Sequence, residues 1–391
     1  MKIAFVTPWY GEFAGGAEVV ARKTAENLSR KGIDVEIFTT CCRSPFDNWW
    51  KDYYRPGKYK INDIVVRRFS VNKNTEAMFH RINYKIINNT RLSNEEELEY
   101  LRGSISSDDM VSFIKENKEN YIFILIPYLY GLTYWAFKVS VGRCILIPCL
   151  HDEMNAYFHT TKDMINNCKI LFLAQEEMML ARQLYSIIEG SFDVIGSGID
   201  IQDNFEPEKF LKKYKIDYKY ILYVGRKDRG KNIDKLIEYF TIYKKIEKDD
   251  LHLIFIGGGD SSLIPKNEYF IDLGYIDDVD KYNAYAGALA TCLLSNNESF
   301  SLVVMESWLA SRPVIVSDNC SVTKGHCIRS NGGLFIADVE EFSEVIRYLK
   351  KYQNTANKIG LNGRKYVLDN YTWDNIIPKY IKLFNEFVIG P

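Results

Sequence analysis

The sequence lacks the features that mark several common classes of protein. Its 50 basic and 51 acidic residues leave a formal net charge of −1. That balance is far from the basic excess of a nucleic-acid-binding protein, so we expect no nucleic-acid partner. The eight cysteines include no Cys-x-x-Cys pair, which argues against a zinc site and a small disulfide framework. The sequence also has no repeat of solenoid length and no low-complexity tract.

Long hydrophobic runs are also missing. Residues 121–137 are almost continuously apolar, but Pro127 and Gly131 divide them, and a membrane-spanning helix needs about 20 apolar residues. We interpret them as a buried strand followed by a helix through residues 134–139. Residues 1–7 form an apolar stretch too short for a signal peptide. We therefore expect a cytoplasmic protein with reduced cysteines.

What the chain does contain is a repeated alternation of strands and helices. Two segments, at residues 2–30 and 220–246, each begin with an apolar strand, a glycine-containing loop and an amphipathic helix. This pattern predicts an α/β protein with doubly wound parallel sheets. Strands are predicted at residues 2–7, 34–40, 121–127, 144–150, 220–225, 251–256, 269–273, 290–295 and 314–317, and helices at 17–30, 233–246, 279–288, 300–310 and 371–387.

The most informative pattern is the glutamate motif (residues 298–306), Glu298-Ser-Phe-Ser-Leu-Val-Val-Met-Glu306. A strand is predicted to end just before Glu298, and a helix to begin within a residue or two of it. The backbone N–H groups of residues 299–301 would then form an anion site at the helix N-terminus. Two carboxylates beside such a site suit a sugar nucleotide, but a helix cap at Glu298 and a solvated Glu306 explain the same residues.

The basic loop (residues 225–232), Gly-Arg-Lys-Asp-Arg-Gly-Lys-Asn, follows the predicted strand at residues 220–225. The guanidinium of Arg226 and the ammonium of Lys231 have the chemistry that a diphosphate leaving group needs when no metal ion neutralises it. A solvated basic loop is the alternative.

Two weaker signals lie in the first half of the chain. The glycine loop (residues 8–18) places Gly15 and Gly16 directly before a predicted helix, where backbone can approach a phosphate or sugar closely. His151 and Asp152 follow the predicted strand at residues 144–150, at the edge where doubly wound sheets bind ligands. A structural histidine is the alternative.

Taken together, these patterns resemble the group 1 (GT4) family of retaining glycosyltransferases, which have the GT-B fold. Glu298 and Glu306 match the family's Glu-x7-Glu motif, and Arg226 and Lys231 match its Gly-Arg-x4-Lys loop. The resemblance implies two Rossmann-like domains facing across a cleft. These are a first domain at residues 1–200 that binds the acceptor, a second at 201–370 that binds the sugar nucleotide, and a helix at 371–391 that packs back on the first.

The resemblance also implies a role for each matched residue. Glu306 would bind the ribose hydroxyls, Glu298 the transferred sugar, and His151 would lie near the reacting sugar and acceptor. Arg226 and Lys231 would take the diphosphate, and the catalytic residues would be Glu298, His151, Arg226 and Lys231. The expected donor site comprises Gly15, Gly16, Arg226, Lys231, Gly258, Tyr275, Ile276, Glu298, Ser299, Phe300, Ser301, Leu302 and Glu306. No metal and no cofactor are expected.

The sequence departs from the family pattern in two places. Ser299 and Ser301 stand where many relatives have glycine, and residues 46–93 contain no motif of the family. That stretch interleaves aromatic and basic residues, which suits an anionic membrane face or an acceptor platform. Trp49, Trp50, Tyr53 and Asp152 are the candidate acceptor-side residues. An ordinary, partly buried insertion is the alternative.

The expected activity is metal-independent transfer of a sugar from a nucleotide sugar to a glycan or lipid-linked acceptor. The expected setting is cell-surface polysaccharide or glycoconjugate synthesis, and peripheral contact at the inner membrane face is a further expectation. A sugar-nucleotide epimerase of the same fold and a non-catalytic sugar-nucleotide-binding partner are the rival interpretations. Asp278 and Asp280 form an Asp-x-Asp sequence, but they lie at a predicted helix start, where aspartate favours capping over metal binding.

Overall fold

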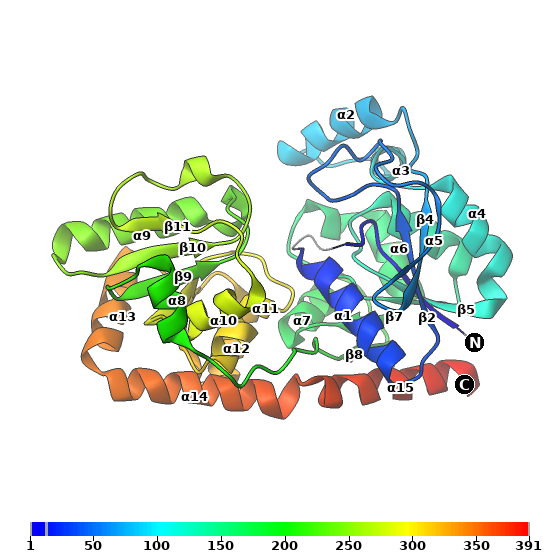
Figure 1. Cartoon of the computed structure of the whole chain (residues 1–391). Coiled ribbons are helices and arrows are strands. Elements are labelled where there is room, and N and C mark those ends of the chain that lie inside the picture. The colour runs from blue at the N-terminus through cyan, green and yellow to red at the C-terminus, as the bar shows by residue number, and fades with distance from the viewer. Residues whose placement is uncertain (1, 12–14, 390–391) are drawn as a thin grey trace. The chain divides into compact units, whose positions relative to one another are not determined.

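The computed structural model describes residues 2–11 and 15–389, which divide into two compact units (Figure 1). Unit 1 comprises Met1–Ser197 and Lys379–Pro391, and unit 2 comprises Gly198–Pro378. The two predicted parallel sheets are present, one in each unit, and each is considered separately below. Within the described residues, no helix has both the length and the hydropathy of a membrane-spanning segment.

The described part of unit 1 is built on an eight-stranded sheet in the order β3-β4-β2-β1-β5-β6-β7-β8. The pairs are parallel except for the hairpin of β3 and β4, whose turn residues Asn62 and Asp63 both have positive φ. The strands are β1 (Lys2–Val6), β2 (Val35–Thr40), β3 (Gly57–Ile61), β4 (Ile64–Phe69), β5 (Tyr121–Leu125), β6 (Cys144–Leu146), β7 (Lys169–Phe172) and β8 (Phe192–Val194).

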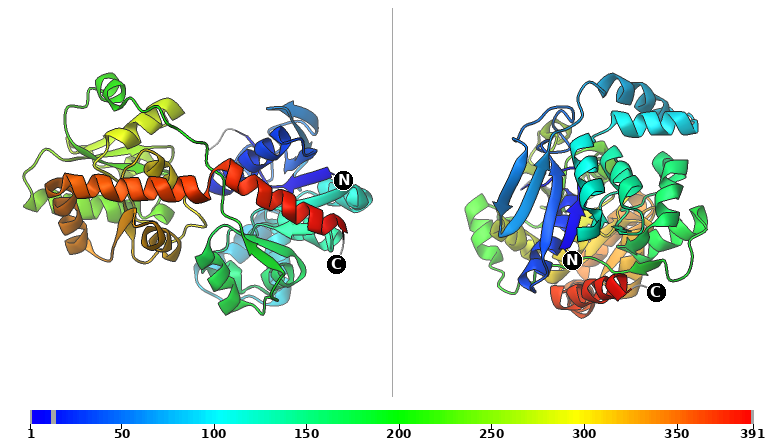
Figure 2. Two further views of the ribbon diagram at one scale, coloured as in Figure 1. Left: turned by 90° about the horizontal axis from the view of Figure 1, so that it is seen from below. Right: turned by 90° about the vertical axis from the view of Figure 1, so that its right-hand side faces the viewer.

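The helices of unit 1 cover this sheet because its central strands are apolar on both faces. β5 is buried along its whole length, as expected for a strand with helices on both sides. Figure 2 shows the light-blue helix α2 beside the cyan helix α3, and these two helices contact each other. The helices are α1 (Gly16–Arg30), α2 (Glu76–Ile87), α3 (Asn94–Gly103), α4 (Asp108–Asn117), α5 (Gly131–Ser140), α6 (His159–Asn167) and α7 (Gln175–Leu184).

The last helix, α15 (Trp373–Ile389), begins in unit 2 and continues into unit 1 from Lys379. Its first residues are anchored in unit 2, where the indole of Trp373 donates to Asp200 at 2.7 Å. Its later residues are anchored in unit 1, where Tyr380 is 1% exposed and Lys379 donates to the carbonyl of Ile195 at 3.2 Å.

Unit 2 contains, within its described residues, a six-stranded parallel sheet in the order β11-β10-β9-β12-β13-β14. The strand order reverses between β9 and β12, which are neighbours in the sheet. Such a switch point is where doubly wound sheets bind ligands. The strands are β9 (Tyr220–Val224), β10 (His252–Ile256), β11 (Phe270–Asp272), β12 (Ala290–Leu293), β13 (Val314–Ser317) and β14 (Gly333–Ile336).

The helices of unit 2 pack in two groups. α9 contacts α13, whereas α10 contacts both α8 and α11. α14 contacts α11 and α12, and it also contacts α13, which links the two groups. This grouping is what right-handed crossovers in this strand order produce. The helices are α8 (Pro207–Tyr214), α9 (Ile233–Ile246), α10 (Asp278–Gly287), α11 (Leu302–Leu309), α12 (Ser321–Ser330), α13 (Val339–Lys351) and α14 (Gln353–Asn370).

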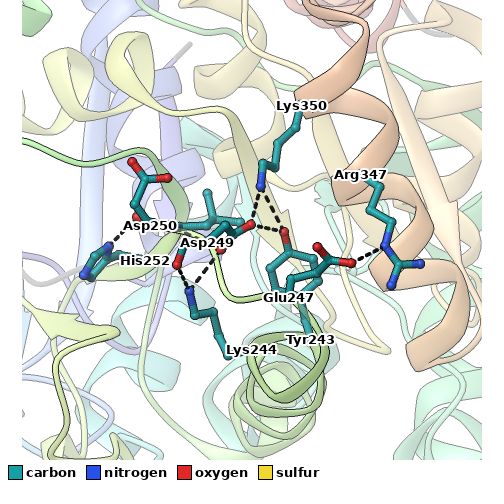
Figure 3. A network of polar contacts seen from close by, with 9 residues as sticks. Tyr243, Lys244, Glu247, Asp249, Asp250, His252, Arg347 and Lys350 are labelled. Carbon is teal, nitrogen blue, oxygen red and sulfur yellow. Dashed lines mark hydrogen bonds and ion pairs between the residues drawn. The ribbon is translucent and has the colours of Figure 1, made fainter.

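A polar cluster joins α9, α13 and the start of β10, and Figure 3 shows it from close by. The carboxylate of Asp249 accepts hydrogen bonds from the hydroxyl of Tyr243 at 2.5 Å, from Lys244 at 3.0 Å and from Lys350. Burial alone would raise the pKa of Asp249, but these hydrogen bonds outweigh it and hold the pKa below its ordinary value. Because the cluster precedes β10, it lies away from the carboxyl ends of the strands and serves the fold.

Candidate functional site

The switch point between β9 and β12 brings the basic loop and the glutamate motif together. The basic loop follows β9, and Glu298 follows β12. Asn232, which has a left-handed φ of 51°, ties the two segments to each other. Its side-chain amide donates to the carbonyl of Leu294 at 2.8 Å and to the side-chain oxygen of Asn296 at 2.9 Å.

Lys231 and Glu298 form an ion pair at this junction, 2.8 Å from Nζ to Oε1. Their side chains are 29% and 12% exposed, so the pair is reachable from solvent but shielded enough for its charges to matter. These two candidate residues come from different motifs and lie 67 positions apart in the sequence, yet they are in direct contact.

The remaining residues of the basic loop have different surroundings. Arg226 is partly exposed and bonded to Asp228. Lys227 is buried and donates to both oxygens of Asp272, at 2.7 and 2.9 Å, while its backbone pairs with the glycine-rich segment at residues 257–259. Lys227 is therefore committed to a buried ion pair, whereas the side chain of Arg226 lies at the surface.

The helix of the glutamate motif begins later than the sequence predicts. α11 starts at Leu302, not at residue 300, because Ser301 adopts a left-handed conformation with φ 68° and ψ 79°. The prediction of a helix over residues 300–310 was wrong at its start. Ser299, Phe300 and Ser301 thus belong to the loop after β12, and the first-turn N–H groups are those of Leu302, Val303 and Val304.

Glu306 lies on α11 and is held by α10. Lys281 donates to its Oε1 at 3.0 Å, and the hydroxyl of Tyr285 donates to its Oε2 at 2.9 Å. Burial alone would lower the pKa of Lys281, but the carboxylates of Glu306 and Asp278 raise it above its ordinary value. Lys281 is therefore charged at neutral pH and keeps Glu306 oriented. Sequence reasoning missed this lysine, because no local pattern links it to a carboxylate 25 residues away.

The side chain of Phe300 points away from solvent and supports the loop. It is 2% exposed and makes edge contacts with His326 and Tyr371, at centroid distances of 5.4 and 4.9 Å. Burial lowers the pKa of His326 to about 3, with a smaller contribution from Arg329. An uncharged aromatic cluster thus packs beneath the glutamate motif, and the contribution expected from Phe300 is restricted to its backbone.

The glycine-rich segment after β10 shapes the neighbouring edge of the site. Gly257 and Gly259 have positive φ values of 129° and 109°, and a side chain at either would collide with backbone of the basic loop. Gly258 has open space around it. Tyr275, after β11, is 71% exposed, whereas Ile276 packs against the core of unit 2.

In unit 1, Gly15 and Gly16 lie at the start of α1, which no side chain caps. The positions between Gly11 and Gly15 in the glycine loop lie outside the described residues. Elsewhere in unit 1, Tyr128 follows β5 and donates to Glu153 at 2.9 Å.

His151 follows β6 as expected, and Glu153 is an acidic neighbour of its ring. Its Nδ1 lies 3.8 Å from Oε1 of Glu153, whereas Asp152 accepts a hydrogen bond from the hydroxyl of Tyr157 at 2.7 Å. Glu177 holds the loop, because its carboxylate accepts from the backbone N–H groups of Leu150 and Leu173, at 2.6 and 2.7 Å.

Comparison with known proteins relates the second half of the chain to one family. Residues 205–366 match the sequence profile of the family described as glycosyl transferases group 1. The chain is also 23% identical to an uncharacterized glycosyltransferase of Methanocaldococcus jannaschii, over 98% of both chains. Residues 205–366, which lie in unit 2, therefore have the sequence profile of the group 1 glycosyltransferases.

Solved structures share the fold of this chain. The sucrose-phosphate synthase of Thermosynechococcus elongatus superposes with a TM-score of 0.72 at 18% identity, over 99% of both chains. The Anabaena protein HepE, solved in complex with UDP and glucose, gives a TM-score of 0.70 at 14% identity, over 99% of this chain and 100% of HepE. The predicted fold class is confirmed by these likenesses.

The candidate acceptor-side aromatics of unit 1 are mostly packing residues. Trp49 lies against Trp9 and Phe79, at centroid distances of 5.6 and 5.3 Å, and the indole of Trp50 donates to the carbonyl of Gly103 at 2.8 Å. Tyr53 is 37% exposed.

Much of the positive charge in residues 46–93 is paired with carboxylates. Arg67 pairs with Glu36, Arg81 with Glu99 and Lys85 with Glu96. The net charge counted along this stretch therefore overstates the charge that its surface presents to an anionic ligand.

The Asp-x-Asp sequence lies in the first turn of α10, where both carboxylates bond to side chains of the protein and the cap is the residue before them. Asp277, just before it, caps α10 by accepting from the N–H of Asp280 at 2.8 Å. Asp280 is bonded to Lys213 and accepts from Tyr214 at 2.9 Å, and Asp278 pairs with Lys281 at 3.0 Å. Within the described part of the chain, no group of three or more potential metal ligands is found.

Proposed function

We propose that this glycosyltransferase moves a sugar from a nucleoside diphosphate sugar without the help of a metal ion. The contact that carries the proposal is the ion pair of Lys231 and Glu298 at the switch point of unit 2. It joins a cation suited to a diphosphate with a carboxylate suited to sugar hydroxyls, beside the N-terminus of α11. That arrangement gives each part of a sugar nucleotide a group of matching chemistry.

The diphosphate is proposed to bind between the basic loop and the start of α11. Arg226 and Lys231 supply positive charge there, and the first-turn amides of α11 supply N–H donors. As the bond to the sugar breaks, negative charge develops on the leaving phosphate. Groups already oriented toward that charge lower the barrier without reorganising, which is the task of the metal ion in other transferases.

The nucleoside is proposed to bind at Glu306. Each of its oxygens accepts one hydrogen bond from the protein, which leaves lone pairs for two adjacent ribose hydroxyls. Because Lys281 and Tyr285 fix the carboxylate, little side-chain entropy is lost on binding. UDP is the first nucleotide to test, since HepE has been solved with UDP and with UDP-glucose.

The remaining parts of the proposal concern the acceptor and the outcome at the sugar. A glycan or lipid-linked acceptor, and retention of the anomeric configuration by front-face attack, follow from the family resemblance. So do a role in cell-surface polysaccharide synthesis and a cytoplasmic position, with peripheral contact at the membrane. His151, with Glu153 beside it, is proposed to approach the reacting sugar.

The test is release of nucleoside diphosphate from UDP-glucose and GDP-mannose by the purified chain and by Glu298→Gln and Arg226→Ala variants. We expect each variant to lose about 100-fold in turnover with little change in melting temperature. Arg229→Ala is the matched control, since Arg229 lies in the same loop and has no proposed role. Unchanged turnover in both variants would remove the assignment. An epimerised nucleotide sugar as product would point to the epimerase alternative.

A further inference from the structure

Ser301 is held in a conformation that serine rarely adopts. It is the N-cap of α11, and its φ of 68° and ψ of 79° lie in the left-handed region. Outside glycine, this region is disfavoured because the Cβ atom crowds the backbone. A non-glycine residue in such a conformation at a ligand site is a reason to look for a function of its side chain.

The hydroxyl of Ser301 does not perform the usual task of a serine at this position. Serine N-caps elsewhere in the chain are extended and accept a hydrogen bond from the first turn. Ser93 accepts from the N–H of Glu96, and Ser107 from the N–H of Met110. Ser301, with its left-handed backbone, makes no such bond.

The same hydroxyl is buried and has no hydrogen-bond partner among the described residues. Ser301 is only 6% exposed, so solvent does not readily replace the missing partner. Buried hydroxyl groups are normally hydrogen-bonded. Ser301 therefore combines backbone strain with an unmet hydrogen bond, at the N-terminus of a helix and three residues after Glu298.

The surroundings indicate which group would satisfy this hydroxyl. The first-turn amides of α11 are donors, and no side chain caps them. Lys231 brings positive charge to the same loop through its pair with Glu298. Hydrogen-bond donors at the start of α11 and a cation paired with Glu298 suit a ligand group rich in acceptor oxygens and negative charge, such as a phosphate.

We infer that the hydroxyl of Ser301 donates a hydrogen bond to a phosphate oxygen of the bound nucleoside diphosphate. This inference rests on the proposed function and adds one side-chain contact to it, specific to a chain with serine at this position. Glycine would relieve the strain and the unmet hydrogen bond in the free protein. Serine there stabilises the bound state at the expense of the free one.

The experiment compares Ser301→Gly, Ser301→Ala and Ser311→Gly with the unmodified chain. Ser311 is the matched control, because it is also a serine with left-handed φ, of 56°, and lies just beyond the other end of α11. Isothermal titration with UDP, GDP, ADP and dTDP gives the dissociation constant of the nucleotide that binds. Thermal melting of the free proteins gives their stability.

Both Ser301 variants are expected to bind that nucleotide about tenfold to a hundredfold more weakly, the range for one hydrogen bond to a charged group. Ser301→Gly is expected to melt above the unmodified chain, and Ser311→Gly to bind the nucleotide unchanged. Binding by Ser301→Gly equal to that of the unmodified chain would overturn the inference and leave the proposed function standing. If the unmodified chain bound none of the four nucleotides, the proposed function would fail, and the inference with it.

Discussion

The polar cluster of Figure 3 gives a quantitative prediction for the stability of unit 2. In an Asp249→Asn variant, one carboxylate oxygen becomes an NH₂ group that faces two donors, whichever way the amide is turned. Either Tyr243 and Lys350, or Lys244 and the N–H of Leu251, then lose their acceptor. The charge that holds both lysines is lost at the same time.

The magnitude follows from the burial of the three charged groups. The side chains of Asp249, Lys244 and Lys350 are 17%, 7% and 25% exposed. The ion pairs are therefore mostly buried, but water still reaches them. Breaking a fully buried pair costs about 3–5 kcal/mol, and access of water to Lys350 reduces that cost. We expect a loss of about 3 kcal/mol at pH 7, or about 9 °C in melting temperature for a unit of this size.

The pH dependence separates this account from a merely steric one. The pKa of Asp249 is lower in the folded state than in the unfolded state, so its contribution is complete above about pH 4 and is lost as pH falls through the folded-state pKa. The difference between the unmodified chain and the variant should therefore narrow below pH 4, measured by urea unfolding. A difference that stays constant down to pH 3 would refute the electrostatic reasoning.

A control variant is available in the same cluster. Glu247 pairs with Arg347 at 2.7 Å, but the two side chains are 33% and 37% exposed. Pairs at that exposure contribute less than about 1 kcal/mol, so Glu247→Gln should change the melting temperature by no more than about 3 °C. A loss as large as that of Asp249→Asn would show that position in the cluster, not burial, sets the energy.

Three further predictions concern other parts of the chain. Trp49→Ala should cost unit 1 about 2–4 kcal/mol in urea unfolding, because the indole packs against four other rings. An unchanged stability would instead favour the acceptor platform. Gly259→Ala should lower the melting temperature, because its Cβ would lie 2.5 Å from the carbonyl oxygen of Lys227, whereas Gly258→Ala should melt as the unmodified chain does. His326 has a folded-state pKa of about 3, below its unfolded value, so the unfolded state takes up a proton as pH falls below about 6.5. The unmodified chain should lose about 2 kcal/mol more than His326→Leu between pH 7.5 and 5, and parallel losses would contradict burial of a neutral imidazole.

The sequence predicted most of the fold because local patterns determine it. The helix at residues 233–246 and the strand at 314–317 were predicted to the residue, since each is an apolar periodic segment with clear ends. The start of α11 was predicted two residues early, because a serine in the sequence does not by itself indicate a left-handed backbone conformation. Residues 46–93 gave no family motif. In the structure they include the β3–β4 hairpin, which pairs with β2, and helix α2, which packs against α3.

The candidate site was predictable only where its residues belong to spaced motifs. Lys231 and Glu298 were both chosen from the sequence, and the structure places them in contact. Lys281 and Glu153 were not chosen from the sequence. Each matters because folding brings it to a candidate residue, Lys281 to Glu306 and Glu153 to His151. The same limit explains the apparent basic surface around Arg67, since its partner Glu36 precedes it by 31 residues and a local charge count cannot include it.

The central claim is a nucleoside diphosphate site that needs no metal ion, and one binding experiment tests it most directly. Thermal melting of the purified chain is measured with UDP, GDP, ADP and dTDP, each with and without EDTA. The account predicts that at least one nucleotide raises the melting temperature, that EDTA leaves the rise unchanged, and that Arg226→Ala abolishes it. A rise that disappears in EDTA, or no rise with any of the four, would contradict the account.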